Sequence, residues 1–216
     1  MSSVNVSVGP RLGTKVKALR SRFWRVLGAM SIVLIGIQFV TGAFLLMNYH
    51  PGGANGMGAY NSVMSIMYDV RWGWIVRYIH TTGASLLFVI VYIHMFRALW
   101  DRTYKKRSGK VWLWGAALLV LLMGEEFMGY VLPYGNMSLW GSMVITNLFG
   151  SVPLVGHNLV TWIRGGPLVS TPTLNRFMAF HVAVIPMALV ALIVMHLQNL
   201  YKLRIEQEAS RSTSQE

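Results

Sequence analysis

The sequence predicts an all-α membrane protein: a bundle of four transmembrane helices with a helical segment on the membrane surface. Of 216 residues, 54% are apolar and only 12% are charged, a composition too hydrophobic for an ordinary soluble domain. The net charge of +12 is concentrated in blocks between apolar stretches, which favours membrane topology over nucleic-acid binding. Four stretches reach the length of about 20 residues that a membrane helix needs: about 26–48, 78–96, 111–134 and 177–201.

The chain opens with a basic segment, residues 1–25, that leads directly into the first span. Because residues 26–48 are long enough to cross a membrane, we expect them to remain as a helix and not to be removed as a signal. The second span, 78–96, and the fourth, 177–201, are likewise free of Asp, Glu, Lys and Arg. Each of these two spans carries a pair of histidines.

The third span, 111–134, differs because it contains two acidic residues, Glu125 and Glu126. Such acids in a span usually face another helix, a bound water or the membrane edge as protonated groups. A role in handling protons is the alternative interpretation.

The connection over residues 135–175 has apolar stretches at about 140–149 and 159–163, punctuated by prolines and glycines. It is typical of one or two short helices lying on the membrane surface. Residues 203–216 are polar, and we expect them to form a flexible, solvated tail.

The distribution of basic residues predicts the orientation. Fifteen of the 19 Lys and Arg residues lie in the N-terminal segment, between the second and third spans, or after the fourth. By the positive-inside rule, both termini are cytoplasmic, on the negative side of a bacterial or archaeal membrane. The second and fourth spans then run parallel, so His80 is level with His181 towards the positive side. His94 is level with His196 towards the negative side.

The spacing of these histidines predicts two metal centres. His80 and His94 are 14 residues apart, and His181 and His196 are 15 apart. On a helix these intervals are about 21 to 22 Å, and they return to within about 40° and 60° of the starting face. Both members of a pair can therefore face one partner helix at two depths, which predicts two stacked haems with two histidine ligands each.

Bis-histidine coordination leaves no open iron site, so we expect electron carriers. The absence of cysteine excludes disulfides and thiolate ligands from this chain. A single histidine in a membrane helix is more often a packing residue. His50 and His157 have no partner at a comparable interval, and we expect them to be loop residues.

Glycines repeat the ligand interval on the two spans without histidine. Gly28 and Gly42 are 14 residues apart on the first span, and so are Gly115 and Gly129 on the third. We interpret them as clearance for haem, with close helix packing as the alternative. Arg77, Arg97 and Arg176, each within five residues of a predicted ligand, are candidates to pair with haem propionates, and topogenic charge is the alternative.

Several motifs resemble cytochrome b of quinol:cytochrome c oxidoreductases. They are Arg77-Tyr-Ile-His80-Thr-Thr-Gly83, Tyr92-Ile-His94-Met-Phe-Arg97, Phe127-Met-Gly129-Tyr130-Val-Leu-Pro133 with the residues up to Gly141, and Arg176-Phe-Met-Ala-Phe180-His181 with Pro186 and His196. Together with Gln38, Thr41 and Gly42, they extend the resemblance over nearly the whole chain. The resemblance implies one dihaem domain over residues 26–202.

The resemblance also implies roles for individual residues. His80 and His181 would hold a low-potential haem on the positive side, and His94 and His196 a high-potential haem on the negative side. The haem-binding set is Gly28, Gln38, Gly42, Arg77, Gly83, Arg97, Trp112, Gly115, Gly129 and Arg176. The residues lining the quinol-oxidation pocket are Phe127, Tyr130, Gly141 and Ile145. The residues bordering a quinone-reduction pocket are Ala29, Ile32 and Lys202.

The activity implied is electron transfer within a cytochrome bc-type complex. Quinol would give one electron to a Rieske iron–sulfur protein and the other, through two b-type haems, to quinone, with proton translocation. Implied partners are the Rieske protein, a cytochrome c-type subunit or acceptor, and a second membrane subunit, in a dimeric complex. A dihaem anchor of a quinone-reducing dehydrogenase or hydrogenase is the alternative function, and a haem-binding assembly protein is a third possibility.

Some residues depart from the family pattern. The segment Pro-Glu-Trp-Tyr is absent, so this chain resembles the short, split form of plastids and some bacteria, in which a partner supplies that glutamate. Val26 stands where the plastid form has a cysteine that attaches an extra haem, so we expect no covalent haem. Tyr134 and Asn136 replace Trp and Gln, and Glu125-Glu126 replaces small or apolar residues, where it would tune the haem or the quinol pocket.

Overall fold

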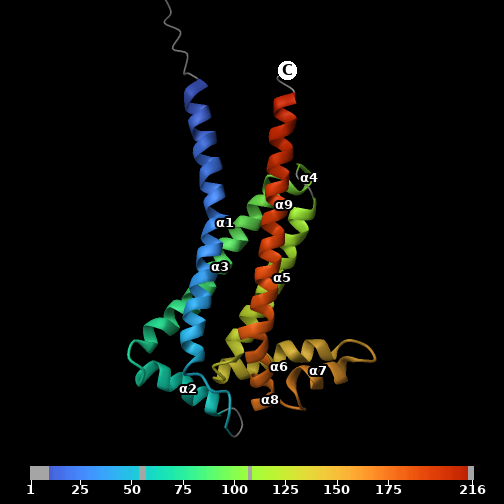
Figure 1. Ribbon diagram of the computed structural model, residues 1–216. Helices are drawn as coiled ribbons and strands as arrows, with labels where there is room; N and C mark the ends of the chain where they lie inside the picture. Colours follow the sequence, from blue (N-terminus) through green and yellow to red (C-terminus); the bar gives the residue numbers. More distant parts are fainter. Residues whose placement is uncertain (1–9, 54–56, 107–108, 214–216) are drawn as a thin grey trace, which may run out of the picture.

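The computed structural model describes residues 10–53, 57–106 and 109–213, and those residues form helices with no strand among them. Four long helices dominate the molecule (Figure 1). They are α1 (Pro10–Leu46), α3 (Gly73–Trp100), α5 (Gly109–Val131) and α9 (Ile185–Thr213). The stretches long and apolar enough to cross a membrane are Val26–Leu46, Gly73–Trp100, Gly109–Val131 and Thr171–Ser210. The predicted all-α fold with four membrane helices is therefore confirmed.

The helices extend beyond their apolar parts. α1 begins at Pro10, inside the predicted basic segment, and α9 continues to Thr213, where the sequence predicted a flexible tail. Both extensions project from the same end of the bundle (Figure 1). Hydropathy marks only the length within the membrane, so it does not indicate where a polar helical extension stops.

The long helices associate as two pairs. α1 packs along α3, and α5 packs along α9, whereas α3 and α5 touch much less. Each pair combines a segment that carries two predicted ligands with a helix that carries the matching glycines. The ligand-bearing segments are α3, with His80 and His94, and η2 (Phe180–Val184) continued by α9, with His181 and His196. A small apolar core joins the pairs, and its buried members are Leu87 of α3, Leu122 of α5, and Ile185 and Leu189 of α9.

Short helices gather at the end of the bundle opposite the two extensions (Figure 1). They are α2 (Met57–Tyr68), α6 (Asn136–Gly150), α7 (Gly156–Arg164) and α8 (Thr171–Ala179), while α4 (Thr103–Lys106) lies at the other end. α6 and α7 form the predicted surface segment. α2 was not predicted, because its 12 residues are too few for a membrane span.

A second core holds these short helices against the bundle. Its buried members include Val63 and Ile66 of α2, Val131 of α5, and Leu174 and Phe177 of α8. Tyr49, which follows α1, donates a hydrogen bond of 2.7 Å to the carbonyl of Leu132, which follows α5. Burial raises the pKa of Tyr49 above its ordinary value, so the phenol keeps the proton it donates. The two helix pairs are thus joined at this end.

Arg164 fastens α7 to α6. Its side chain is buried, and its guanidinium donates to Thr146 Oγ1 at 2.7 and 2.8 Å and to Asn147 Oδ1 at 2.9 Å. It also donates to the carbonyls of Met143 and Pro167. Burial lowers the pKa of Arg164 from its ordinary value. Because several donors of one planar group reach both segments, this residue fixes the angle between the two helices.

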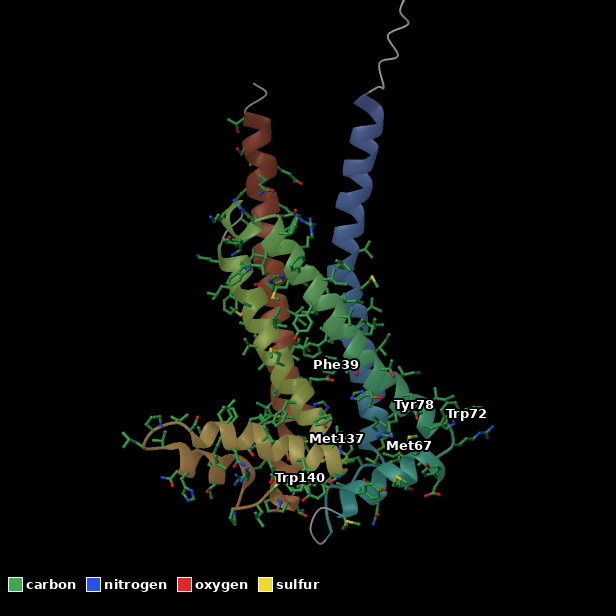
Figure 2. All side chains as sticks on the ribbon, turned by 180° about the vertical axis from the view of Figure 1, so that it is seen from behind. Phe39, Met67, Trp72, Tyr78, Met137 and Trp140 are labelled. Carbon is green, nitrogen blue, oxygen red and sulfur yellow. The ribbon has the colours of Figure 1, made fainter. Side chains whose placement is uncertain are left out.

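Aromatic side chains mark the same end of the bundle. Trp72 and Tyr78 beside α2, and Trp140 on α6, are exposed and lie at this level (Figure 2). Exposed Trp and Tyr at the end of a membrane helix are typical of the interface between lipid and water. They place the short helices at one membrane surface.

Candidate functional site

His80 and His181 face each other between the two helix pairs. Their ring centres are 6.2 Å apart and their planes are perpendicular, at 87°. With a metal–imidazole bond of about 2 Å and a ring centre roughly 1 Å beyond each nitrogen, two rings that share a metal lie about 6 Å apart. The observed separation therefore fits one metal ion between the rings.

Both histidines line a cavity of about 310 Å³. The remaining wall is mostly apolar and comes from all four long helices, including Leu87, Leu122 and Leu189. Its polar members include Gln38, Arg77, Glu125 and Glu126. A largely apolar cavity with a few polar groups is suited to a hydrophobic cofactor that carries a few polar or charged groups.

Thr41 fixes the protonation of the His80 ring. The Thr41 hydroxyl donates to the carbonyl of Ile37 at 2.7 Å, and its oxygen lies 2.9 Å from His80 Nδ1. Because the hydroxyl proton is engaged, the oxygen accepts a hydrogen bond from Nδ1–H. His80 Nε2 then carries the free lone pair that a metal needs.

Glu125 fixes the protonation of the His181 ring, to which it offers two hydrogen-bond acceptors. Nδ1 of His181 lies 3.1 Å from the main-chain carbonyl of Glu125 and 3.1 Å from its carboxylate Oε1. A carbonyl and a carboxylate can only accept, so Nδ1 carries the proton and Nε2 is free for a metal.

A glycine lies against each of the four histidine rings. Distances from a Cβ built on the glycine to the ring Cε1 are 3.6 Å for Gly28 and His94, 3.2 Å for Gly42 and His80, 3.3 Å for Gly115 and His196, and 2.6 Å for Gly129 and His181. The sequence predicted these glycines as clearance for haem. The group that occupies the freed space here is the imidazole.

Because glycine has no side chain, each ring can lie close to the main chain of the neighbouring helix. At Gly129, the carbonyl one turn earlier, that of Glu125, lies 3.1 Å from Nδ1 of His181. On the negative side, Nδ1 of His94 and of His196 is buried and has no hydrogen bond to any residue that the structure describes.

Gln38 is inserted beside the first turn after His80. In the orientation that pairs donors with acceptors, its amide nitrogen donates to the His80 carbonyl at 2.8 Å, and its oxygen accepts from Ala84 N–H at 3.2 Å. An α-helix joins those two main-chain groups directly. A Cβ on Gly83 would collide with the Gln38 amide, so the glycine makes the insertion possible.

A π-helical turn contains His181. Residues Phe180–Val184 form this turn, labelled η2 in the chain order, and the N–H of Ile185 donates to the carbonyl of Phe180. A π turn holds one more residue than an α turn. The 15-residue interval to His196 therefore acts as 14 α-helical residues, which matches the interval from His80 to His94.

The predicted arginine and tryptophan contacts differ in position. Arg77 lines the cavity with His80. Arg97 forms an ion pair of 3.2 Å with Asp101, one turn along α3. Trp112 packs against Tyr104 with ring centres 6.3 Å apart, and Arg176 lies against Gly165. Of this group, Arg77 is the residue that the structure brings to the cavity.

The residues predicted for quinol oxidation lie near the surface helices. Tyr130 contacts Gly141, 3.1 Å from a Cβ built there, so α5 and α6 meet at this point. Phe127 packs on Phe177 with ring centres 5.7 Å apart. Ile145 is exposed on α6. None of these four lines the cavity between the histidines.

Sequence reasoning assigned no role to Thr41, although the residue directly precedes Gly42. A hydroxyl residue beside a glycine at the ligand interval was the available signal. The pairing of each glycine with one particular histidine was also missed, because it depends on which helices are neighbours.

Comparisons with known proteins give consistent matches. Residues 13–204 match the family described as Cytochrome b/b6/petB. Cytochrome b of Allochromatium vinosum is 45% identical over 179 residues, which cover 83% of this chain and 42% of that protein. Cytochrome b of Rhodospirillum rubrum is 45% identical over 83% of this chain and 43% of its own length.

A solved structure, a hyperthermophilic respiratory Complex III, contains a chain of similar fold. The TM-score is 0.77 at 33% identity, over 83% of this chain and 48% of that one. The chain thus spans less than half the length of the relatives it matches.

Proposed function

Because this chain belongs to the cytochrome b/b6 family, we propose that it is the dihaem electron-transfer subunit of a quinol-oxidising cytochrome bc-type complex. The observation that carries the proposal is the fourfold contact between a histidine ring and a glycine of the neighbouring helix. These contacts lie at two levels of a bundle whose helices are long enough to cross a membrane.

The residues present fit two haems. His80 and His181 are at the separation of two ligands on one metal, and the proton on each Nδ1 leaves Nε2 free. His94 and His196 have buried, unpartnered Nδ1 atoms among the described residues. When bound, haem supplies one-electron iron chemistry. The chain's part is to hold the two centres at two depths and to exclude water between them with the core around Leu87 and Leu122.

In this proposal the chain carries electrons from the side of the short helices to the opposite side. Quinol is oxidised near Phe127, Tyr130, Gly141 and Ile145, and quinone is reduced near Ala29, Ile32 and Lys202. Protons leave on the positive side and are taken up on the negative side. Arg77, which lines the cavity beside His80, pairs with a haem propionate.

The partners follow from the same family membership. We expect a Rieske iron–sulfur protein, a cytochrome c-type subunit or acceptor, and a second membrane chain that carries Pro-Glu-Trp-Tyr. The similar chain of known structure comes from a respiratory Complex III, which supports such an assembly over a dehydrogenase or hydrogenase anchor.

The test is purification of the complex followed by quinol:acceptor kinetics with wild type and two histidine variants. His80→Leu is expected to lose quinol oxidation, whereas the control His157→Leu, an exposed histidine on α7, keeps it. A purified complex that reduces quinone from a dehydrogenase partner and does not oxidise quinol would establish the alternative function.

A further inference from the structure

The four predicted ligands have unequal hydrogen-bond acceptors. The neutral hydroxyl of Thr41 accepts the hydrogen bond of His80 Nδ1. Among the described residues, the negative-side rings have no acceptor in hydrogen-bond geometry. Only His181 is bonded to a carboxylate in the part of the chain that the structure describes. The charged acceptor is therefore confined to one ligand of the positive-side pair.

Glu125 holds the His181 ring with two oxygens. Its main-chain carbonyl and its Oε1 are both 3.1 Å from Nδ1. The two side chains are only 17% and 16% exposed, and Oε2 is buried without a partner among the described residues. A carboxylate in such surroundings acts on its neighbours through a low dielectric, so its charge is weakly screened.

We propose that Glu125 is a positioning residue that orients His181 and lowers the reduction potential of the positive-side haem. This inference rests on the proposed function. A carboxylate that accepts the Nδ1 proton makes an imidazole a stronger donor to its metal and fixes the ring orientation. Stronger donation and a nearby negative charge both favour the oxidised, more positive iron over the reduced iron.

The same arrangement gives electron transfer a direction. In the part of the chain that the structure describes, the negative-side ligands have no carboxylate acceptor, so a haem iron held there would lack this stabilisation of the oxidised state. An electron is then held less tightly on the positive side than on the negative side. Glu125 thereby favours movement from the quinol-oxidation side to the quinone-reduction side.

Glu126 is the matched control. It has the same side chain, follows Glu125 on α5 and lines the same cavity. No hydrogen bond joins it to a histidine in the described chain, in contrast to Glu125. A general effect of acidic charge near the cavity would appear in both positions, whereas an effect through His181 would appear only at Glu125.

The experiment is an equilibrium redox titration of the full complex, followed in the optical absorption of each haem, for wild type, Glu125→Gln, Glu125→Leu and Glu126→Gln. Gln removes the charge and keeps a neutral acceptor, and Leu removes both. We expect Glu125→Gln to favour reduction of the positive-side haem about tenfold, about 59 mV for one electron. Glu125→Leu shifts it further, and Glu126→Gln shifts it several-fold less. The negative-side haem keeps its potential in all variants.

Equal shifts in Glu125→Gln and Glu126→Gln, or no shift in either, would overturn the role of Glu125. If Glu125→Gln fails to assemble, Glu125→Asp keeps the charge but shortens the side chain, and a potential equal to that of wild type would count against the proposal. A wild-type complex without two haems would instead refute the proposed function itself, so the two failures are distinguishable.

Discussion

At the scale of single residues, the site depends on four glycines, which have no side chain. An imidazole cannot lie against a helix backbone if a Cβ occupies the contact, and the four glycines leave the room that the four rings fill. The fit differs among the positions. The distance from a Cβ built on the glycine to the ring Cε1 is shortest at Gly129, 2.6 Å, and longest at Gly28, 3.6 Å.

Substituting each glycine by alanine is expected to give losses in the same order. Gly129→Ala adds a methyl group that the His181 ring must move away from, at a cost of about 1–3 kcal/mol for overpacking, and it loses most of the positive-side haem. Gly42→Ala and Gly115→Ala cause partial loss, and Gly28→Ala little. The loss in each variant is measured as the haem content per chain.

Two other glycines in the same helices serve as controls. Gly36 on α1 and Gly124 on α5 have nothing within 4 Å of an added Cβ. Alanine at these positions should keep both haems, since it also has a higher helix propensity than glycine. Equal haem loss at control and ligand-facing positions would contradict the pairing of glycine and histidine.

At the scale of elements, the π turn compensates for the difference between the 14-residue and the 15-residue histidine intervals. His80 and His94 are 14 residues apart on a regular helix, and His181 and His196 are 15 apart with one residue absorbed by Phe180–Val184. The rings of both pairs can therefore project from their helices in the same way. From sequence alone, the second interval ends about 60° from its starting face.

Deletion of Ala183, which is exposed within the π turn, is expected to convert the turn to α-helix and to retain both haems. Deletion of Val89, exposed on α3, shortens the interval from His80 to His94 from 14 to 13 residues and rotates one ligand by about 100°. That variant should lose one haem. If the Ala183 deletion lost as much haem as the Val89 deletion, the compensation would be disproved.

Arg164 sets the position of the surface helices, and its replacement should loosen them. Arg164→Met leaves Asn147 Oδ1 and two carbonyls without their donor, at a cost of about 2–3 kcal/mol. Arg164→Lys keeps the charge but lacks the planar group, so it restores only part of the stability. Limited proteolysis at the exposed Leu154 between α6 and α7 measures the effect, and unchanged cleavage rates would contradict it.

The sequence was sufficient for the four membrane helices, because hydrophobic length is a local signal. The assignment of the four histidines as ligand pairs stays a prediction. Its resemblance to cytochrome b is confirmed by the family match. It did not predict α2, the π turn or the insertion of Gln38, which depend on neighbouring segments. The two acids were noted, but the contact between Glu125 and His181 requires α5 and η2 to be adjacent.

At the scale of the whole molecule, the fold has two different ends. The short helices and exposed aromatic residues lie at one end, and the basic extensions of α1 and α9 project from the other (Figures 1 and 2). The positive-inside rule predicts the cytoplasm on the side of the extensions. In the proposed function, this orientation would determine which haem receives electrons from quinol.

Because the chain has no cysteine, single introduced thiols can report this orientation. Leu154→Cys, in the connection between α6 and α7, should react with a membrane-impermeant thiol reagent added to intact cells. Ser212→Cys, near the end of α9, should react only after the cytoplasmic face is opened. The reverse pattern of labelling would invert the predicted topology.

Two bis-histidine haems in one chain are the central prediction for this protein. The most direct measurement is the ratio of haem to polypeptide in the purified complex, combined with the spin state of each iron by electron paramagnetic resonance. We predict two noncovalent haems per chain, both low-spin because histidine occupies both axial positions. A ratio of one or zero, or an iron with an open axial position, would contradict it.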